Sequence, residues 1–95
     1  MELILLKYGE VIANDEKSNE IYKAIKSALD KNEEIVIDAR DVTISTKSAR
    51  LIFGKLYMEL KEKFGKIKFK NNSALFTFSV NEGISTELAQ NSENA

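Results

Sequence analysis

Two carboxylates and one arginine directly follow the most apolar short segment of the chain. Asp38, Arg40 and Asp41 come after residues 35–37, Ile-Val-Ile, which we expect to form a buried strand. Open α/β sheets bind ligands at the carboxyl ends of their strands, and carboxylate oxygens are preferred ligands of Mg²⁺. A charged connection after a buried strand is usually only solvated, however, and a hydrolytic site needs more acidic residues nearby. We therefore predict no metal or cofactor and retain these three residues as candidate contacts with a partner.

Composition removes most catalytic chemistry. The chain of 95 residues has neither His nor Cys, so it lacks the commonest general base, a thiolate nucleophile and the usual zinc ligands. Its 14 basic and 15 acidic residues give a formal charge of −1, which is too little to drive nonspecific binding to nucleic acid. We expect a protein that is not an enzyme.

The apolar run at the N-terminus does not resemble a signal peptide. It covers residues 3–6, stops at Lys7 and follows Glu2, where a signal peptide has basic residues. No apolar run approaches the ~20 residues that a membrane span needs. We expect no membrane partner and a cytoplasmic location.

A short basic strand offers the main alternative. Lys66, Lys68 and Lys70 alternate with Ile67 and Phe69, a pattern typical of a half-buried strand with a lysine-rich outer face. Lysines of this kind commonly protect the edge of a sheet. They would also suit a small nucleic-acid-binding accessory protein, but the alternation places Phe69 on the face opposite the lysines, which separates stacking from charge.

Four elements are expected in the first half of the chain. The short apolar runs 2–7 and 11–13, joined by turn residues, predict a β-hairpin. A helical period from Asn14 or Asp15 to Asn32 predicts an amphipathic helix. Residues 34–38 follow as the expected central strand, and their continuous apolar triplet predicts burial on both faces.

The longest helical pattern follows the central strand. Ser45 or Thr46 is its expected N-cap and Gly65 its expected end.

Residues 73–88 fit both a strand and a helix. One domain over residues 1–90 is expected, with residues 91–95 as a disordered tail. The expected fold class is α/β, a small sheet with helices on at least one face. In the helix predicted after the central strand, one side carries a continuous apolar stripe: Ala49, Ile52, Phe53, Leu56, Leu60 and Phe64.

Three segments resemble the central motif of a family of STAS-like domains of unknown function. They are Ile-Val-Ile-Asp at 35–38, Asp-Val-Thr-Ile-Ser at 41–45 and Phe-Gly-Lys-Leu at 53–56. These domains are similar to bacterial anti-sigma-factor antagonists. The resemblance covers roughly residues 2–70. It implies about four strands and three helices, with residues 73–88 as a helix.

The resemblance also implies a regulatory role in partner switching. Related proteins bind histidine-kinase-like ATPases or anti-sigma-type proteins, and phosphorylation at the start of the second helix turns them off. Ser45, Thr46 and Ser48 are the candidate phosphoacceptors in this sequence. Ser and Thr are also the ordinary helix caps, and the acid-Ser-Ser-Gly motif of true antagonists is absent, so capping is the favoured role.

The second helix offers a candidate partner-binding surface. Leu51, Tyr57 and Met58 fall off its buried stripe, and Arg50 and Gly54 lie beside them. Arg, Met and aromatic side chains are enriched in interface cores. Packing within the fold and a homodimer are the alternative roles for these residues. Our leading hypothesis is a regulatory domain that docks the loop 39–48 and the second helix onto a protein partner.

Overall fold

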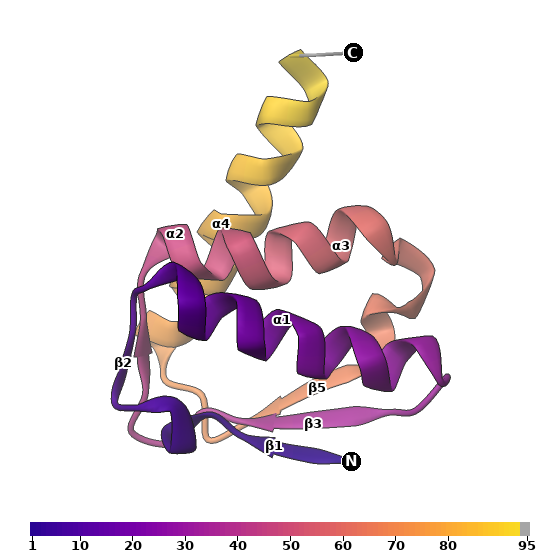
Figure 1. The fold of residues 1–95 in the computed structure, drawn as a ribbon. Coiled ribbons are helices and arrows are strands. Elements are labelled where there is room, and N and C mark those ends of the chain that lie inside the picture. Colours follow the sequence, from indigo (N-terminus) through magenta and orange to yellow (C-terminus); the bar gives the residue numbers. More distant parts are fainter. Residues whose placement is uncertain (94–95) are drawn as a thin grey trace.

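The computed structural model describes residues 1–93 as an α/β fold with two small parallel sheets (Figure 1). In chain order the elements are β1 (Glu2–Ile4), the 3-10 turn η1 (Leu5–Tyr8), β2 (Val11–Ile12), α1 (Asp15–Asp30), β3 (Ile35–Asp38), β4 (Thr43–Ile44), α2 (Thr46–Ala49), the π-helical segment η2 (Arg50–Gly54), α3 (Lys55–Glu59), the 3-10 segment η3 (Lys61–Lys66), β5 (Ile67–Lys70) and α4 (Ala74–Glu93). The α/β class is therefore confirmed, and residues 1–93 form five short strands instead of about four and four α-helices instead of about three.

The predicted N-terminal hairpin is wrong. β1 pairs in parallel with β3, and β2 pairs in parallel with β4 in a separate two-stranded sheet. The apolar run at the N-terminus serves two elements: Leu3 is buried in β1, whereas Leu5 is buried in the turn η1 that follows. Gly9 then adopts a φ of 121°, which L-residues rarely adopt, and the chain leaves η1 toward β2 without folding back on β1.

The three-stranded sheet has the order β1-β3-β5, so β3 is the central strand as predicted and β5 is an edge strand. The helices cover only one face of this sheet (Figure 1). Ile35 and Ile37 point to that face and are fully buried, whereas Val36 is half-buried and Ile4 is 51% exposed on the other face. Burial of β3 on both faces was therefore a wrong prediction. The reason is that α4 packs on the helical layer instead of on the open face of the sheet.

The first helix agrees with its sequence pattern. Asn14 caps α1, because its side-chain oxygen accepts a hydrogen bond of 2.8 Å from the Lys17 backbone N–H. Ile21, Ile25 and Leu29 are fully buried beneath it. Asn32 ends this region in the left-handed conformation, with a φ of 60°.

The second helical region is less regular than its apolar stripe predicts. Ser45 caps it as expected, and the helix then passes through α2, η2 and α3. It ends at Glu59, not at Gly65, because Leu60 leaves helical geometry at φ −129° and ψ 45°. The remainder up to Lys66 is the 3-10 segment η3. The stripe residues before this break are fully buried, namely Ala49, Ile52, Phe53 and Leu56.

The ambiguous segment 73–88 lies within the long helix α4, as the resemblance implies. Phe76 and Val80 bury one side of this helix against the second helical region and β4. The helix continues through Glu93, three residues into the expected tail, and Asn94 and Ala95 lie outside the described residues. Within residues 1–93, no helix is long and apolar enough to cross a membrane.

Candidate functional site

A groove lies between the second helical region and the far half of α4. We call it the helix groove, and its volume is about 600 Å³. It is open to solvent and combines apolar and charged side chains. Its walls are formed by Lys47, Arg50, Leu51, Lys55, Met58, Glu59, Glu87 and Asn91.

Two glycines set the geometry of this groove. A Cβ atom on Gly83 would lie 2.5 Å from the backbone nitrogen of Arg50 and 2.7 Å from the carbonyl carbon of Ala49. A Cβ atom on Gly54 would lie 2.9 Å from the backbone oxygen of Gly83. Only glycine allows α4 to cross the second helical region at this distance. Beyond the crossing, α4 rises away from the body (Figure 1) and supplies the second wall.

The first wall contains the π-helical segment η2. The Lys55 backbone N–H donates to the carbonyl oxygen of Arg50, five residues earlier, which is the π pattern. The wider turn shifts the side chains that follow out of the 3.6-residue phase. Segments of this kind occur frequently at functional sites. The π-helical segment therefore supports the choice of this wall as part of the candidate site.

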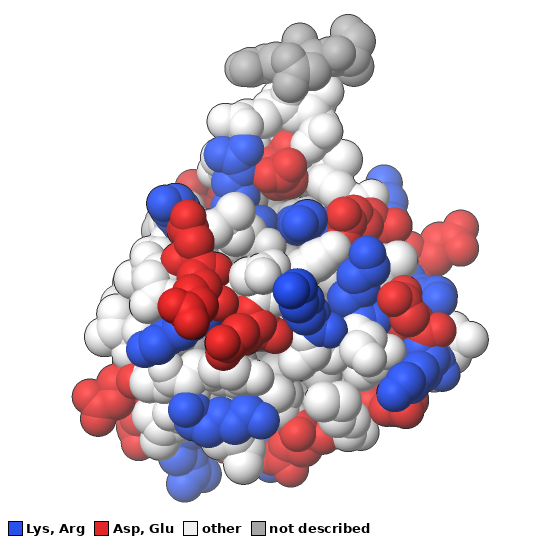
Figure 2. All heavy atoms as spheres, in the orientation of Figure 1, with Lys and Arg blue, Asp and Glu red and all other residues white. Residues whose placement is uncertain are grey.

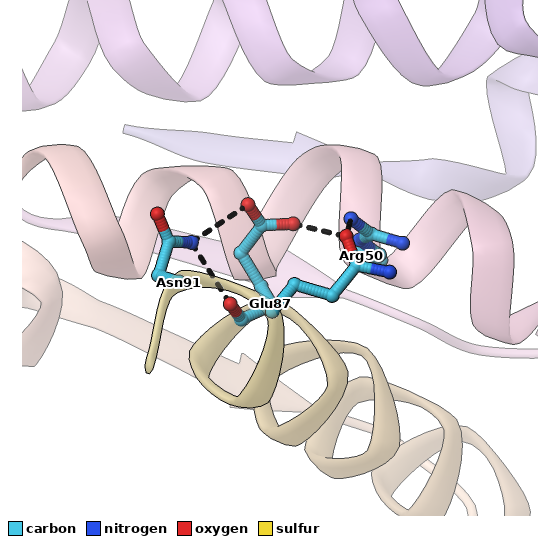
Figure 3. Close-up of polar contacts among 4 residues, drawn as sticks. Arg50, Glu87 and Asn91 are labelled. Atoms are coloured by element: carbon cyan, nitrogen blue, oxygen red, sulfur yellow. Dashed lines mark hydrogen bonds and ion pairs between the residues drawn. The ribbon is translucent and has the colours of Figure 1, made fainter. Parts of the chain in front are cut away.

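Arg50, Glu87 and Asn91 form a polar cluster where the two walls meet (Figure 3). The Arg50 Nε donates to Glu87 Oε2 at 2.7 Å, and a second guanidinium nitrogen donates to Gln90. Asn91 Nδ2 donates to the backbone oxygen of Glu87 at 2.8 Å and to its Oε1 at 3.1 Å. The Arg50 guanidinium lowers the pKa of the Glu87 carboxyl, with a further contribution from Asn91. The cluster therefore fixes the angle between the walls and holds Arg50 in place.

Glu87→Gln is expected to reduce the dependence of stability on pH. Because the folded-state pKa of Glu87 is lowered, its charge stabilises the fold above the unfolded-state value of about 4.3, and this contribution is lost as pH falls through the lower folded value. The variant should lose about 1 kcal/mol of unfolding free energy at pH 7. It should then show a smaller further loss between about pH 5 and pH 3 than the wild type. Urea unfolding at several pH values measures both effects, and parallel pH curves for the two proteins would contradict them.

Leu51 and Met58 supply the apolar part of the groove. They are 37% and 40% exposed, so each retains uncovered apolar surface for a partner. Lys47 and Lys55 lie four residues before and after Leu51. Lys47 makes an exposed ion pair of 3.3 Å with Asp15, and the ammonium of Lys55 lies 4.3 Å from the centre of the Tyr22 ring. The groove thus presents apolar side chains between two lysines whose ammonium groups contact residues of α1.

The structure brings together three of the five residues that were proposed on the second helix. Arg50, Leu51 and Met58 line the helix groove. Gly54 does not, because it is buried beneath α4 and serves the helix crossing. Tyr57 is half-buried and packs edge to face on Phe64, with 5.3 Å between ring centroids. Gly54 and Tyr57 are therefore assigned to packing.

The charged residues after β3 form a separate surface. The carboxylate of Asp38 accepts hydrogen bonds from the Asn71 side chain at 3.0 Å and from the Arg40 backbone N–H at 3.1 Å, and these bonds lower its pKa. Arg40 and Asp41 are exposed and line a shallow depression of about 550 Å³ that shares no residue with the helix groove. Within residues 1–93, no three acidic side chains lie close enough together to hold a metal ion.

The three candidate phosphoacceptors differ in access. The Ser45 hydroxyl accepts a hydrogen bond of 3.1 Å from the Ser48 backbone N–H and acts as the N-cap. Ser48 is 1% exposed, so an enzyme cannot reach it in the folded protein. Thr46 is exposed at the first position of α2. Access therefore favours Thr46, and the capping role predicted for Ser45 is confirmed.

Ser48→Ala is expected to leave stability unchanged or to raise it by up to about 1 kcal/mol. Among the described residues, the buried Ser48 hydroxyl has no hydrogen-bond partner, so its removal loses no bond. Ser18→Ala is the matched control, because the equally buried Ser18 hydroxyl donates to the Asn14 backbone oxygen at 2.7 Å. Thermal and urea unfolding should show a loss of about 1 kcal/mol for the control only. Equal losses in the two variants would contradict this prediction.

The lysines of β5 do not form a basic platform. The ammonium of Lys66 donates to the Asn32 backbone oxygen at 3.0 Å, and this residue precedes the strand. Lys70 forms an ion pair of 2.5 Å with Glu2 on the same open face of the sheet, whereas Lys68 is exposed. Side chains of both signs are interspersed on the molecular face in Figure 2. These neighbours weaken the case for nucleic-acid binding.

Several residues of the helix groove were not proposed from the sequence. Glu87 belongs to the segment 73–88, whose secondary structure was ambiguous, and Asn91 belongs to the expected disordered tail, so no partner for Arg50 could be named. Neither Lys47 nor Lys55 was named as a site residue from the sequence. One sequence pattern could have indicated the two lysines. Lys47, Leu51 and Lys55 are spaced four residues apart, so they share one side of a helix.

No family model matches this chain, and no curated protein or solved structure matches it either.

Proposed function

We propose that this protein is a non-enzymatic regulatory domain that binds a protein partner in the helix groove. The observation that carries the proposal is the convergence of Arg50 and Met58, residue types that are enriched in interface cores, with the exposed apolar side chain of Leu51 on one groove. Of loop 39–48, Lys47 alone lines the helix groove. The proposed docking surface is therefore smaller than the whole loop and second helix that the sequence suggested.

The groove is suited to an elongated apolar segment, such as one face of a helix. Leu51 and Met58 provide contact area along one wall, and Arg50 is held by Glu87, so little side-chain freedom is lost on binding. Lys47 and Lys55 lie at the rim, where charge affects the rate and specificity of association more than the final affinity. This division of roles is typical of a protein interface with a small apolar centre.

The proposed partner class follows from the STAS-like resemblance, which implies a histidine-kinase-like ATPase or an anti-sigma-type protein. Thr46 is the proposed site of control, because it is exposed and lies one residue before Lys47 in the groove wall. A phosphate there would add a charge of about −1.5 to −2 beside the lysine. That charge would make the electrostatic potential at the rim of the helix groove more negative, and so change the attraction between the groove and a charged partner.

Affinity capture from host lysate tests this function. Wild-type protein and Leu51→Asp are immobilised in parallel, with and without nuclease treatment. We expect the wild type to retain a specific protein after nuclease treatment and the variant to lose it. Loss of every captured protein upon nuclease treatment would instead support the nucleic-acid alternative, and equal capture by both proteins would exclude the helix groove.

A further inference from the structure

The far half of α4, residues 84–93, is poorly packed against the rest of the molecule. Of the residues up to Asn91, Gly83 is the last that is buried, whereas Phe76 in the first half is fully buried. From Ile84 to Asn91, three side chains are half-buried and five are exposed. Ile84 packs against the core at the start of the segment, and beyond it the helix rises away from the body (Figure 1). Burial therefore stabilises the first half of α4 much more than the far half.

The far half is also a weak helix on its own. It is only ten residues long, whereas isolated helices shorter than ~12–15 residues are marginal in water. Half of its residues are Ile, Ser, Thr or Asn, which are weaker helix formers than Ala, Leu, Gln or Glu. The last turn, which ends at Glu93, carries no basic residue that could compensate the negative end of the helix dipole. The segment therefore depends on contacts with the body to remain helical.

One side chain supplies the polar contacts of the far half with the body. Arg50 donates to Glu87 at 2.7 Å from its Nε and to Gln90 from a second guanidinium nitrogen. The bonds of Asn91 in Figure 3 stay within α4, and among residues 1–93 no other hydrogen bond or ion pair joins the far half to another element. The Arg50 and Glu87 side chains are 31% and 24% exposed, so water competes for their bond. Arg50 therefore holds the far half by bonds of moderate strength.

We propose that the far half of α4 is a clasp that opens and closes while the rest of the fold stays intact, and that Arg50 is its latch. Proteins open locally where few apolar contacts are buried, and such openings cost much less than global unfolding. Gly83 marks the boundary of the clasp. It is the last buried residue, and glycine is the weakest helix former after proline.

The opening controls access to the helix groove, and this consequence rests on the proposed function. Glu87 and Asn91 belong to the wall that the clasp supplies, so the complete groove exists only in the closed state. The apparent dissociation constant of a partner is its intrinsic value divided by the closed fraction. The strength of the latch therefore sets the affinity of the groove without any change in the residues of the first wall.

Hydrogen exchange of the free, full-length chain tests the opening. We expect the backbone amides of residues 84–93 to be protected, but to exchange through an opening that depends little on urea. The amides of α1 beneath Ile25 and Leu29 should exchange only through global unfolding, which urea promotes strongly. If the far half is unprotected, or if its exchange follows the same urea dependence as α1, the proposal is overturned.

Two substitutions test the latch and the helix separately. Arg50→Gln should raise the opening equilibrium of residues 84–93 about fivefold or more, because it removes the bonds to Glu87 and Gln90. Ala89→Gly should raise it about fivefold through helix propensity alone, because Ala89 is exposed and lies outside the groove walls. The exchange of α1 should respond much less in both variants.

The matched control for the latch is Arg40→Gln. Arg40 is the other arginine of the chain, is exposed and lies in the depression after β3, which shares no residue with the helix groove. This variant should leave the exchange of residues 84–93 unchanged, and equal acceleration by Arg40→Gln and Arg50→Gln would overturn the role of Arg50. These measurements need no partner. Failure of the clasp is therefore distinguishable from failure of the proposed function, which the capture experiment tests.

Discussion

Gly83→Ala is expected to lower the free energy of unfolding by about 2–3 kcal/mol. The added methyl group would lie 2.5 Å from the backbone nitrogen of Arg50, and it would also clash with Ala49. These neighbours are mainly backbone atoms inside a helix, so they cannot rotate away as the end of a side chain could. Alanine gains about 1 kcal/mol over glycine in helix propensity, which is smaller than the cost of separating the helices. Urea unfolding followed by circular dichroism measures the difference.

The matched control for this substitution is Gly65→Ala. A Cβ atom on Gly65 would meet no atom within 4 Å, and the φ of Gly65 lies outside the left-handed region. This variant should be as stable as the wild type or more stable by about 0.4–1 kcal/mol, because alanine restricts the unfolded chain. A Gly83→Ala protein as stable as the Gly65→Ala protein would show that α4 does not cross the second helical region at the distance described.

Leu51→Asp is expected to weaken binding of the captured partner about thirtyfold or more. The substitution places a charge at the apolar centre of the helix groove, between Lys47 and Lys55, where a partner would have to desolvate it. Leu51 is 37% exposed, so the fold itself should lose no more than about 0.5–1 kcal/mol. Calorimetric titration of the purified partner into each variant measures the affinity.

Leu6→Asp provides the comparison for this experiment. Leu6 is 40% exposed, nearly the same as Leu51, but it lies in η1 and outside the helix groove. The same change in charge and side-chain size there should leave the affinity unchanged. Equal weakening by the two variants would mean that general surface charge, not the helix groove, governs binding.

Elements with strong local signals could be predicted from the sequence. The Asn14 cap and the apolar period of α1 lie within one segment, so no distant contact is needed to specify them. The same is true of the Ser45 cap and of the alternating edge strand β5. In each case the residues that determine the structure are only a few positions apart.

Features that depend on distant contacts could not be predicted. The N-terminal run looks like one arm of a hairpin until β3 is known to be the partner of β1. The π-helical segment lies where Gly83, some thirty residues later, packs against its backbone. No local property of residues 50–54 indicates either the wider turn or the close crossing.

The candidate site was only partly predictable for the same reason. Arg50, Leu51 and Met58 could be named because they fall off the buried stripe of one helix. Glu87 and Asn91 could not, because the period of α4 is obscured by apolar residues on both of its sides. The two walls of the helix groove come from segments that only the tertiary fold brings together.

Site-specific photo-cross-linking in the host cell tests the central claim most directly. A photoreactive phenylalanine analogue is placed at position 51 in one strain and at position 6 in another. If the protein acts by binding a partner in the helix groove, irradiation should join position 51 to one discrete protein, and position 6 should yield no such product. The same product from both positions, or none from position 51, would contradict the account.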